Sequence, residues 1–231
     1  MRLFLLGIVV LQLAGASAVE AASQPEVQEQ RNSDGSWLRL TQTEQPAQGR
    51  RLLQVDLRTS ANAPYAPVLQ RSQVLAEFPR GRGRLEDIDG DGLWEFVETD
   101  FCGAGPNCVQ TIFKVNPQRK TAWRFLHGGF FTVRRIGAFV VTAGRSSCCS
   151  WVHQAYRVPA GERTITDQDL AYSISVSGPL DKTSTTARCV ISRPAGSGWV
   201  LTDLKHKQLR QLCALYGDDV VINPPDAEPT P

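Results

Sequence analysis

The stretch that decides the fold runs from Val109 to Leu126 and reads VQTIFKVNPQRKTAWRFL. Two runs rich in β-branched and aromatic residues, Val109–Val115 and Thr121–Leu126, flank the polar segment Asn116–Lys120, which contains a proline. Such runs are typical of strands, and a short polar segment between them is typical of a hairpin loop. We therefore expect two antiparallel strands here.

Runs of the same kind recur on both sides of this hairpin, with glycine and proline breakers between them. The other strand-like runs are Trp37–Thr41, Leu53–Leu57, Leu93–Phe101, Phe130–Arg135, Ala138–Thr142, Trp151–Val158, Ala187–Ser192 and Trp199–Leu201. The segment Val68–Phe78 fits either a strand or a short helix. Short strands separated by turns predict a mainly β, antiparallel fold with incomplete propeller-like or sandwich-like sheets.

One helix is expected near the C-terminus. Thr202 and Asp203 are typical capping residues for a helix over Leu204–Tyr216, which Gly217 would stop. Leucines form much of an apolar stripe along this segment, and Cys213 lies on the same side. A disulfide between Cys189 and Cys213 would therefore join the helix to the adjacent strand.

The first residues have the features of a secretory signal peptide. Arg2 precedes an apolar run from Leu3 to Leu13, and Ala16-Ser17-Ala18 matches the small-residue pattern of a cleavage site. A membrane anchor would need about 20 apolar residues, and this run is shorter. We expect a signal peptide over residues 1–18 and a soluble periplasmic or secreted protein without membrane insertion.

The remaining chain divides by composition. Residues 19–36 are polar and lack hydrophobic periodicity, which predicts a flexible lead-in. Residues 37–217 contain all the strand-like runs and the expected helix, and form the expected β domain. Residues 218–231 are rich in proline and are predicted to be a disordered tail.

Charge and cysteine content narrow the function classes. The chain has 25 Lys and Arg against 23 Asp and Glu, and this near balance gives no support to nucleic-acid binding. Six cysteines in an exported chain predict up to three disulfides, whose pairing the sequence leaves open. A zinc site made from Cys102, Cys108, Cys148 and Cys149 is the alternative, but their spacing does not match structural zinc sites.

One motif carries chemistry. The stretch Asp87–Glu98, DIDGDGLWEFVE, matches the pattern D-x-[DN]-x-[DN]-G-x5-E of calcium loops. Acids at alternate positions converge on a hard cation, Gly92 allows the sharp turn, and the next residue offers its carbonyl. The alternative is a structural Asp/Gly turn, which would concentrate like charges without a counter-ion.

The flanks of this loop argue against an EF-hand. Pro79, Gly81 and Gly83 oppose an incoming helix, and the following run is β-type. A loop that leads into a strand is therefore expected, and its acidic cage favours Ca²⁺ over Mg²⁺. The predicted ligands are Asp87, Asp89, Asp91, the Leu93 carbonyl and Glu95, with Glu98 optional.

The loop, the following Cys102–Cys108 segment and the strand Val109–Val115 resemble integrin-type (FG-GAP) propeller repeats of exported bacterial proteins. With the later strands and the Cys148-Cys149 pair, the chain resembles the calcium-dependent periplasmic lysozyme inhibitors, which have an incomplete propeller fold. The resemblance covers roughly Leu85 to Val158. The resemblance implies that the chain binds a protein partner, a lysozyme-like hydrolase, and has no catalytic activity of its own.

No sequence motif of a hydrolase or a nucleotide-binding protein is present. The three histidines, His127, His153 and His206, stand outside such motifs. We therefore expect a binding protein without catalytic residues. The first hypothesis is an inhibitor or immunity-type protein directed at a lytic envelope enzyme, and the second is a calcium-stabilised envelope adhesion or assembly module. The third is a hydrolase whose catalytic residues converge in the fold without a sequence motif.

Overall fold

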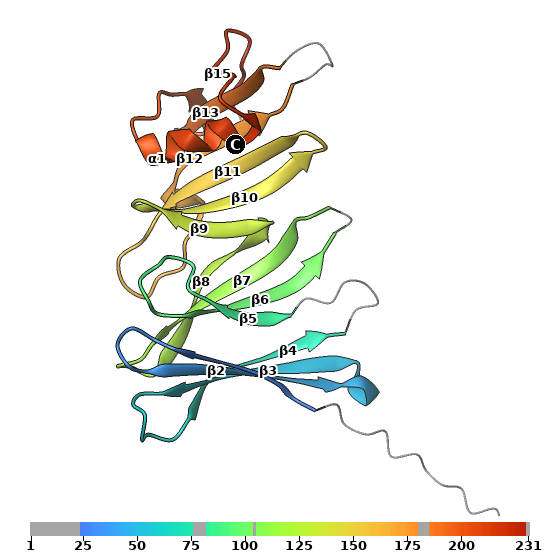
Figure 1. Cartoon of the computed structure of the whole chain (residues 1–231), viewed down its shortest axis with the longest axis vertical. Coiled ribbons are helices and arrows are strands. Elements are labelled where there is room, and N and C mark those ends of the chain that lie inside the picture. The colour runs from blue at the N-terminus through green and yellow to red at the C-terminus, as the bar shows by residue number, and fades with distance from the viewer. Residues whose placement is uncertain (1–23, 76–81, 104, 180–184, 230–231) are drawn as a thin grey trace, which may run out of the picture.

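The computed structural model describes residues 24–75, 82–103, 105–179 and 185–229, which form three mainly antiparallel sheets stacked one on another (Figure 1). Each sheet is built mainly from strands that are consecutive in the sequence. The expected mainly β, antiparallel fold with a C-terminal helix is confirmed. The expected signal peptide lies outside the described residues.

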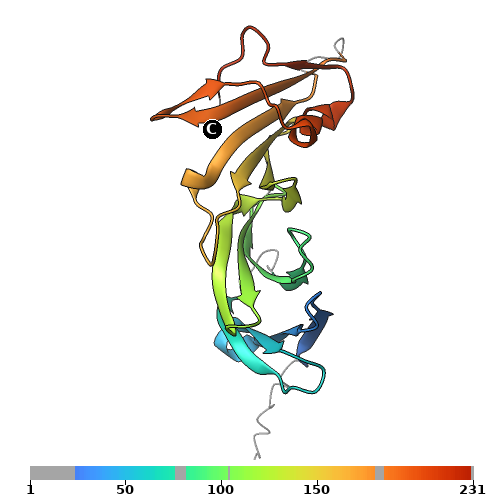
Figure 2. The same cartoon turned by 90° about the vertical axis from the view of Figure 1, so that its left-hand side faces the viewer.

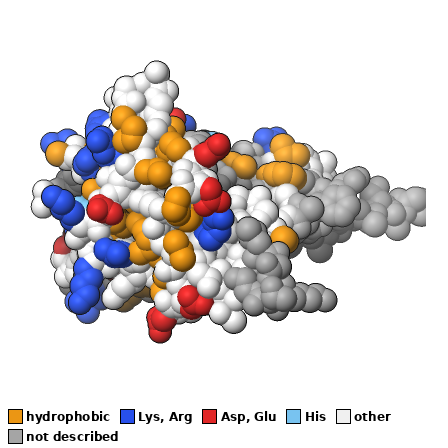
Figure 3. All heavy atoms as spheres, turned by 90° about the horizontal axis from the view of Figure 1, so that it is seen from above, with side chains coloured by type: hydrophobic (Ala, Val, Ile, Leu, Met, Phe, Trp, Pro, Cys, Tyr) orange, Lys and Arg blue, Asp and Glu red, His pale blue; other side chains and the backbone are white. Residues whose placement is uncertain are grey.

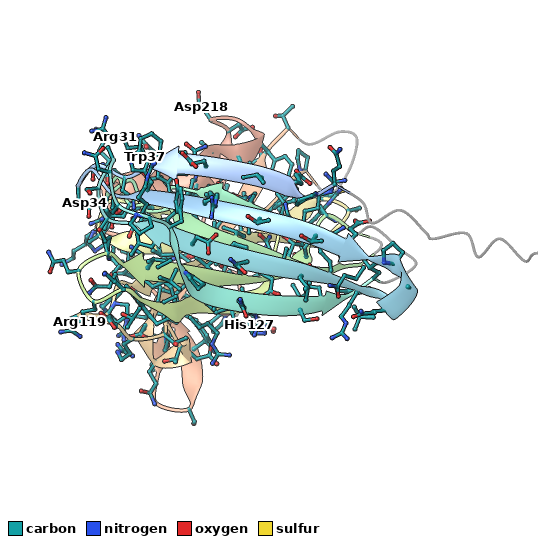
Figure 4. All side chains as sticks on the ribbon, turned by 90° about the horizontal axis from the view of Figure 1, so that it is seen from below. Arg31, Asp34, Trp37, Arg119, His127 and Asp218 are labelled. Carbon is teal, nitrogen blue, oxygen red and sulfur yellow. A yellow bond between two sulfur atoms is a disulfide. The ribbon has the colours of Figure 1, made fainter. Side chains whose placement is uncertain are left out.

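The first sheet has the strand order β1-β2-β3-β4. Its strands are β1 (Glu26–Arg31), β2 (Trp37–Gln45), β3 (Arg50–Arg58) and β4 (Ala66–Val74), with a 3-10 turn, η1 (Pro46–Gln48), between β2 and β3. Arg31, Asp34 and Trp37 lie together at the β1–β2 turn, at one end of the sheet (Figure 4). The Arg31 guanidinium is 6.0 Å from the centre of the Trp37 ring.

Strand β1 lies within the segment expected to be a flexible lead-in, so that expectation is corrected. Its residues alternate only between exposed and half-buried, which explains the missing hydrophobic period. The strand forms because its backbone pairs with β2 from Glu26↔Gln42 to Arg31↔Trp37. The Gln28 side chain also accepts a hydrogen bond from the Leu85 amide of the second sheet, at 3.1 Å.

The second sheet has the order β5-β6-β7-β8. Its strands are β5 (Gly83–Glu86), β6 (Glu95–Cys102), β7 (Cys108–Asn116) and β8 (Thr121–Phe130). Strands β7 and β8 form the hairpin predicted from Val109–Leu126, with the register Asn116↔Thr121 at its turn. Strand β5 was not predicted.

The third sheet has the order β14-β13-β12-β11-β10-β9, and β15 pairs in parallel with β13. Its strands are β9 (Thr132–Ile136), β10 (Phe139–Ser147), β11 (Ser150–Arg157), β12 (Leu170–Ser177), β13 (Ala187–Ala195), β14 (Gly198–Leu201) and β15 (Val220–Ile222). A 3-10 turn, η2 (Asp167–Asp169), precedes β12, which was not predicted either. Seen from above, this end of the molecule shows apolar side chains beside clusters of Lys and Arg (Figure 3).

The C-terminal helix is shorter than expected. It consists of α1 (Lys207–Arg210) and the 3-10 turn η3 (Gln211–Tyr216), and lies on one side of the third sheet (Figure 2). Thr202 does not cap it, because the Thr202 amide donates to the Ile191 carbonyl and continues the sheet pairing. Cys189 and Cys213 form the predicted disulfide, which joins β13 to η3.

The segment after Gly217 is also ordered as far as residue 229, which corrects the expected disordered tail. Strand β15 pairs with Ala187–Cys189. The Asn223 side chain accepts from the Ile191 amide at 2.7 Å and donates to the Thr202 carbonyl at 3.0 Å. The tail therefore completes the third sheet.

Three hydrophobic clusters hold the layers together. One lies between the first and second sheets, where Phe96 and Phe113 stack with ring centres 5.8 Å apart. The second lies between the second and third sheets and includes Val97 and Ile112. The third packs Leu209 and Cys213 on the outer face of the third sheet. Full burial of a side chain such as Phe96, which is 0% exposed, contributes about 2 to 3 kcal/mol.

In the described ranges, no helix has the length and apolar character needed to span a membrane.

Candidate metal centre

The acidic loop joins β5 to β6 and begins and ends beside the pair Glu86↔Glu95. Gly90 and Gly92 adopt positive φ angles of 69° and 81°, a region that residues with a Cβ rarely enter. Gly92 also has no room for a side chain, because a Cβ there would lie 2.6 Å from the Ser33 side chain. The loop can therefore make its two tight turns only with glycine at these positions.

Aspartate side chains fix the course of the loop backbone. Asp87 accepts hydrogen bonds from the Gly90 amide at 2.8 Å and from the Gly92 amide at 3.2 Å. Asp91 accepts from the Leu93 amide at 2.7 Å. Such local bonds between Asp and the following amides stabilise turns, and here they fold the acidic residues around a common centre.

Three carboxylates converge at this centre. Asp87, Asp89 and Glu95 each offer an oxygen within 4.8 Å of the others. Asp89 is 5% exposed and Glu95 is 1% exposed. The Asp89 Oδ1 atom is buried and has no hydrogen-bond partner in the described part of the chain. An unpartnered buried oxygen beside two further carboxylates fits a hard cation with oxygen ligands.

Lys114 supplies a positive charge from β7. Its Nζ lies 2.5 Å from Asp89 Oδ2, 3.2 Å from Asp91 Oδ2 and 3.2 Å from Glu95 Oε1. One ammonium balances only part of the charge of Asp87, Asp89, Asp91 and Glu95. The cluster therefore retains a net negative charge that a divalent cation would neutralise.

For both Glu95 and Lys114, burial and the neighbouring opposite charges shift the pKa in opposite directions. Burial raises the pKa of Glu95 to about 8, although the Lys114 charge and the Ile88 amide, which donates to Glu95 at 2.8 Å, act to lower it. Burial alone would lower the pKa of Lys114, but the charge of Glu95 and the Asp89 carboxylate outweigh it and raise that pKa. A metal ion requires the ionised carboxylate, so binding at this site would release protons.

The predicted ligands do not all meet. Asp87, Asp89 and Glu95 converge, and Leu93 and Asp91 line the same pocket of about 290 Å³ as Asp89 and Glu95. Glu98 lies on the opposite face of β6, because strand side chains alternate and Glu98 is an odd number of residues from Glu95. Its carboxylate is 2.9 Å from Nε of Arg71 in β4, and Glu98 is 1% exposed.

Two contributors to the site were not predicted. Lys114 is the only charged residue of the strand-like run Val109–Val115 and lies between apolar neighbours. This position could have indicated that Lys114 pairs with buried acids. The β1–β2 turn also touches the loop: the Ser33 amide donates to the Gly92 carbonyl and the Asn32 side chain accepts from the Trp94 amide, both at 2.8 Å. No local sequence pattern indicates this second contact.

The cysteines form two disulfides in the described part of the chain. Cys102 is bonded to Cys108 at the end of the β6–β7 pair, and Cys189 to Cys213. Because Cys102 and Cys108 are bonded to each other, they do not form the alternative zinc site with Cys148 and Cys149. Cys148 and Cys149 are exposed at the β10–β11 turn with their Sγ atoms 2.7 Å apart.

The histidines occupy separate places. His127 Nδ1 is 2.9 Å from Thr111 Oγ1. His206 packs edge-on against Phe139, with ring centres 4.9 Å apart. His153 is buried within the third sheet. The expected absence of catalysis stays a prediction.

Comparison with known proteins gives one distant structural likeness. No family model and no curated protein matches the chain. Among solved structures, a Xanthomonas protein described as related to a type IV secretion system aligns with a TM-score of 0.43 and 12% sequence identity. The alignment covers 79% of this chain and 99% of that chain. At this level of similarity, the comparison assigns no function.

Proposed function

We propose that this chain is an exported calcium-binding protein that binds and inhibits a lytic envelope enzyme such as a lysozyme. Asp87, Asp89 and Glu95 hold the Ca²⁺ ion, with Asp91 and the Leu93 carbonyl as further ligands. The ion is structural: it neutralises the loop and keeps the sheets in place. Inhibition follows from binding and needs no catalytic residue.

The observation that carries the proposal is the convergence of three carboxylates around the unpartnered Asp89 Oδ1 atom. Oxygen-rich acidic cages in flexible loops suit Ca²⁺, whereas Mg²⁺ demands a stricter octahedral shell and retains its water. Export is supported by the two disulfides, because such bonds persist in oxidising compartments. The inhibitory partner rests on the resemblance of Leu85–Val158 to the calcium-dependent lysozyme inhibitors.

The metal half of the proposal is tested by thermal unfolding with added Ca²⁺ and with EDTA. A ligand at roughly a hundredfold its Kd stabilises the folded state by about 3 kcal/mol, so calcium should raise the Tm of the wild type by several degrees. Asp89→Asn should abolish this shift. Asp218→Asn, which changes an exposed acid outside the loop, should retain it. An unchanged wild-type Tm in EDTA would refute the calcium assignment.

The partner half is tested separately with purified protein against a panel of lysozymes of different types. Inhibition that is present with calcium, and lost in EDTA and in Asp89→Asn, would support both halves. Calcium-dependent stability with no inhibition of any lysozyme would refute the inhibitor assignment alone. Capture of a non-lytic envelope protein would then favour the adhesion or assembly hypothesis.

A further inference from the structure

The C-terminal helix covers only part of the outer face of the third sheet. The turn η3 packs on β12, β13 and β15, and its disulfide holds it there. Leu209 and Leu212 also share a buried cluster with residues of β10 and β11, and Ile136 of β9 packs against this cluster. A pocket of about 320 Å³ opens between the end of η3 and these three strands.

The pocket has apolar walls. Phe131 and Trp151 stand at one side with their rings edge to face, 5.6 Å apart at the centres. Ala143 leaves space between them and the next strand, and Leu215 borders the pocket from the helix side. Phe131 and Leu215 are 50% and 48% exposed, so these apolar walls are open to a ligand.

The side chains of His153 and Arg134 line the same pocket, and each has a polar group without a hydrogen-bond or ion-pair partner in the described residues. His153 is 6% exposed, and its Nε2 atom is buried with no hydrogen-bond partner in the described residues. The backbone of Arg134 pairs with Val141 of β10, but its side chain makes no hydrogen bond or ion pair within the described ranges. A buried polar atom without a partner is costly, so a ligand that satisfies it gains affinity.

We propose that this pocket binds a small organic anion with an apolar, ring-sized body and a carboxylate or similar head group. The body lies between Phe131, Trp151 and Leu215. Arg134 pairs with the head group, and the neutral His153 ring donates a hydrogen bond to it from Nε2. This pocket shares no lining residue with the pocket beside the acidic loop. The proposed anion site is therefore independent of the proposed calcium site.

Size and charge select this class of ligand. The volume lies at the lower end of the range for small-molecule pockets, so it suits a compact molecule. The unpaired guanidinium attracts an anion and repels a cation. A neutral ligand of the same shape would fill the apolar space but leave Arg134 unpaired.

The test is calorimetric titration of the folded, calcium-loaded protein with a matched series: phenylpropanoate, phenylpropanol and phenylpropylamine. We expect saturable binding of the carboxylate, about tenfold weaker binding of the alcohol and still weaker binding of the amine. Arg134→Gln should reduce the affinity for the carboxylate to that for the alcohol. Arg193→Gln, which removes an exposed charge from the same sheet outside the pocket, should leave all three affinities unchanged.

A fluorescence titration locates the bound ligand. Phenylpropanoate should quench tryptophan emission in the wild type. Trp151→Phe should remove most of this quenching even at ligand concentrations that saturate the variant, and its calorimetric affinity should fall because Trp151 forms one wall of the pocket. Equal affinities for the three compounds, the absence of saturable binding, or an unchanged preference in Arg134→Gln would each overturn the proposal. Arg134 is exposed, so its substitution leaves the fold intact and the result remains decisive.

Discussion

Lys114 and a calcium ion would serve the same carboxylates. The ammonium contacts Asp89, Asp91 and Glu95, and two of these acids are buried. Without either cation, the like charges of the loop would repel one another in a region of low dielectric. The lysine can therefore hold the loop together when calcium is absent, and it shares the acids with the metal when calcium is present.

Lys114→Met should make the protein more dependent on calcium. In EDTA, the loss of the partner for buried carboxylates should cost about 3 kcal/mol of unfolding free energy. With saturating calcium the cost should be smaller, because the metal neutralises the same acids. Urea unfolding under both conditions measures the difference, and the exposed Lys205→Met is the control. Equal destabilisation in both conditions would contradict this shared role.

His153 should make stability fall in mild acid. Burial, assisted by the charge of Arg134, lowers its pKa from 6.5 to about 4. Above pH 6.5 the ring is neutral in both states, and between pH 6.5 and 4 only the unfolded state gains the proton. Stability therefore falls by about 3 kcal/mol over this window and no further below it.

His153→Gln should remove this contribution, so its unfolding free energy should decline less between neutral pH and pH 4 than that of the wild type. Urea unfolding at a series of pH values measures both curves. His206→Gln replaces an exposed histidine and should follow the wild type. A slope in His153→Gln equal to that of the wild type would show that other groups set the acid limit.

At the scale of elements, the first and second sheets are joined by a charged pair as well as by the apolar core. Glu98 of β6 is buried, and Arg71 of β4 reaches it from the neighbouring sheet at 2.9 Å. The Arg71 guanidinium also lies 5.5 Å from the centre of the Phe113 ring. Glu98, the last acid of the calcium pattern, therefore pairs with Arg71 between the two sheets.

Arg71→Met should destabilise the protein by about 2 kcal/mol, because it leaves Glu98 buried without its partner. Adding Glu98→Gln should recover part of that loss, since the charge is then gone. A double-mutant cycle by urea unfolding measures the coupling. Additive effects of the two substitutions would mean that the pair contributes nothing beyond its separate side chains.

The elements differ in how far local sequence determines them. Val109–Val115 and Thr121–Leu126 are rich in β-forming residues and are separated by a clear turn. Strand β7 therefore matches the prediction closely and β8 begins where expected, although β8 continues to Phe130. Strand β1 has no apolar face and strand β15 is only three residues long, and both pair with segments that are distant in the sequence. Strand β12 alternates apolar and small residues, so this strand could have been predicted from the sequence.

The candidate site divides in the same way. The spacing of Asp87, Asp89 and Gly92 identifies the loop because its chemistry is local. The role of Glu98 depends on the strand face it occupies and on Arg71, which lies 27 residues away. The Lys114 contact likewise depends on the pairing of β6 with β7.

At the scale of the whole molecule, the acidic loop contacts all three sheets. Its Gly92 carbonyl accepts from the Ser33 amide in the β1–β2 turn, and its Ile88 carbonyl accepts from the Arg135 amide in β9, at 3.0 Å. The loop itself joins two strands of the second sheet (Figure 1). Folding of the loop is thus coupled to the docking of both outer sheets.

Calcium should therefore control the cooperativity of unfolding as well as stability. With calcium, far-ultraviolet circular dichroism and tryptophan fluorescence should report one coincident urea transition. In EDTA or in Asp89→Asn, the outer sheets should separate from the second at lower urea, so the two signals should no longer coincide and the apparent m-value should fall.

Trp37 in the first sheet and Trp151 in the third allow the sheets to be followed separately through Trp37→Phe and Trp151→Phe variants. Asp218→Asn should retain the coincident transition of the wild type. Coincident transitions in EDTA at a lower midpoint would mean that the apolar cores alone couple the sheets. The loop would then add stability to a single cooperative unit without linking its layers.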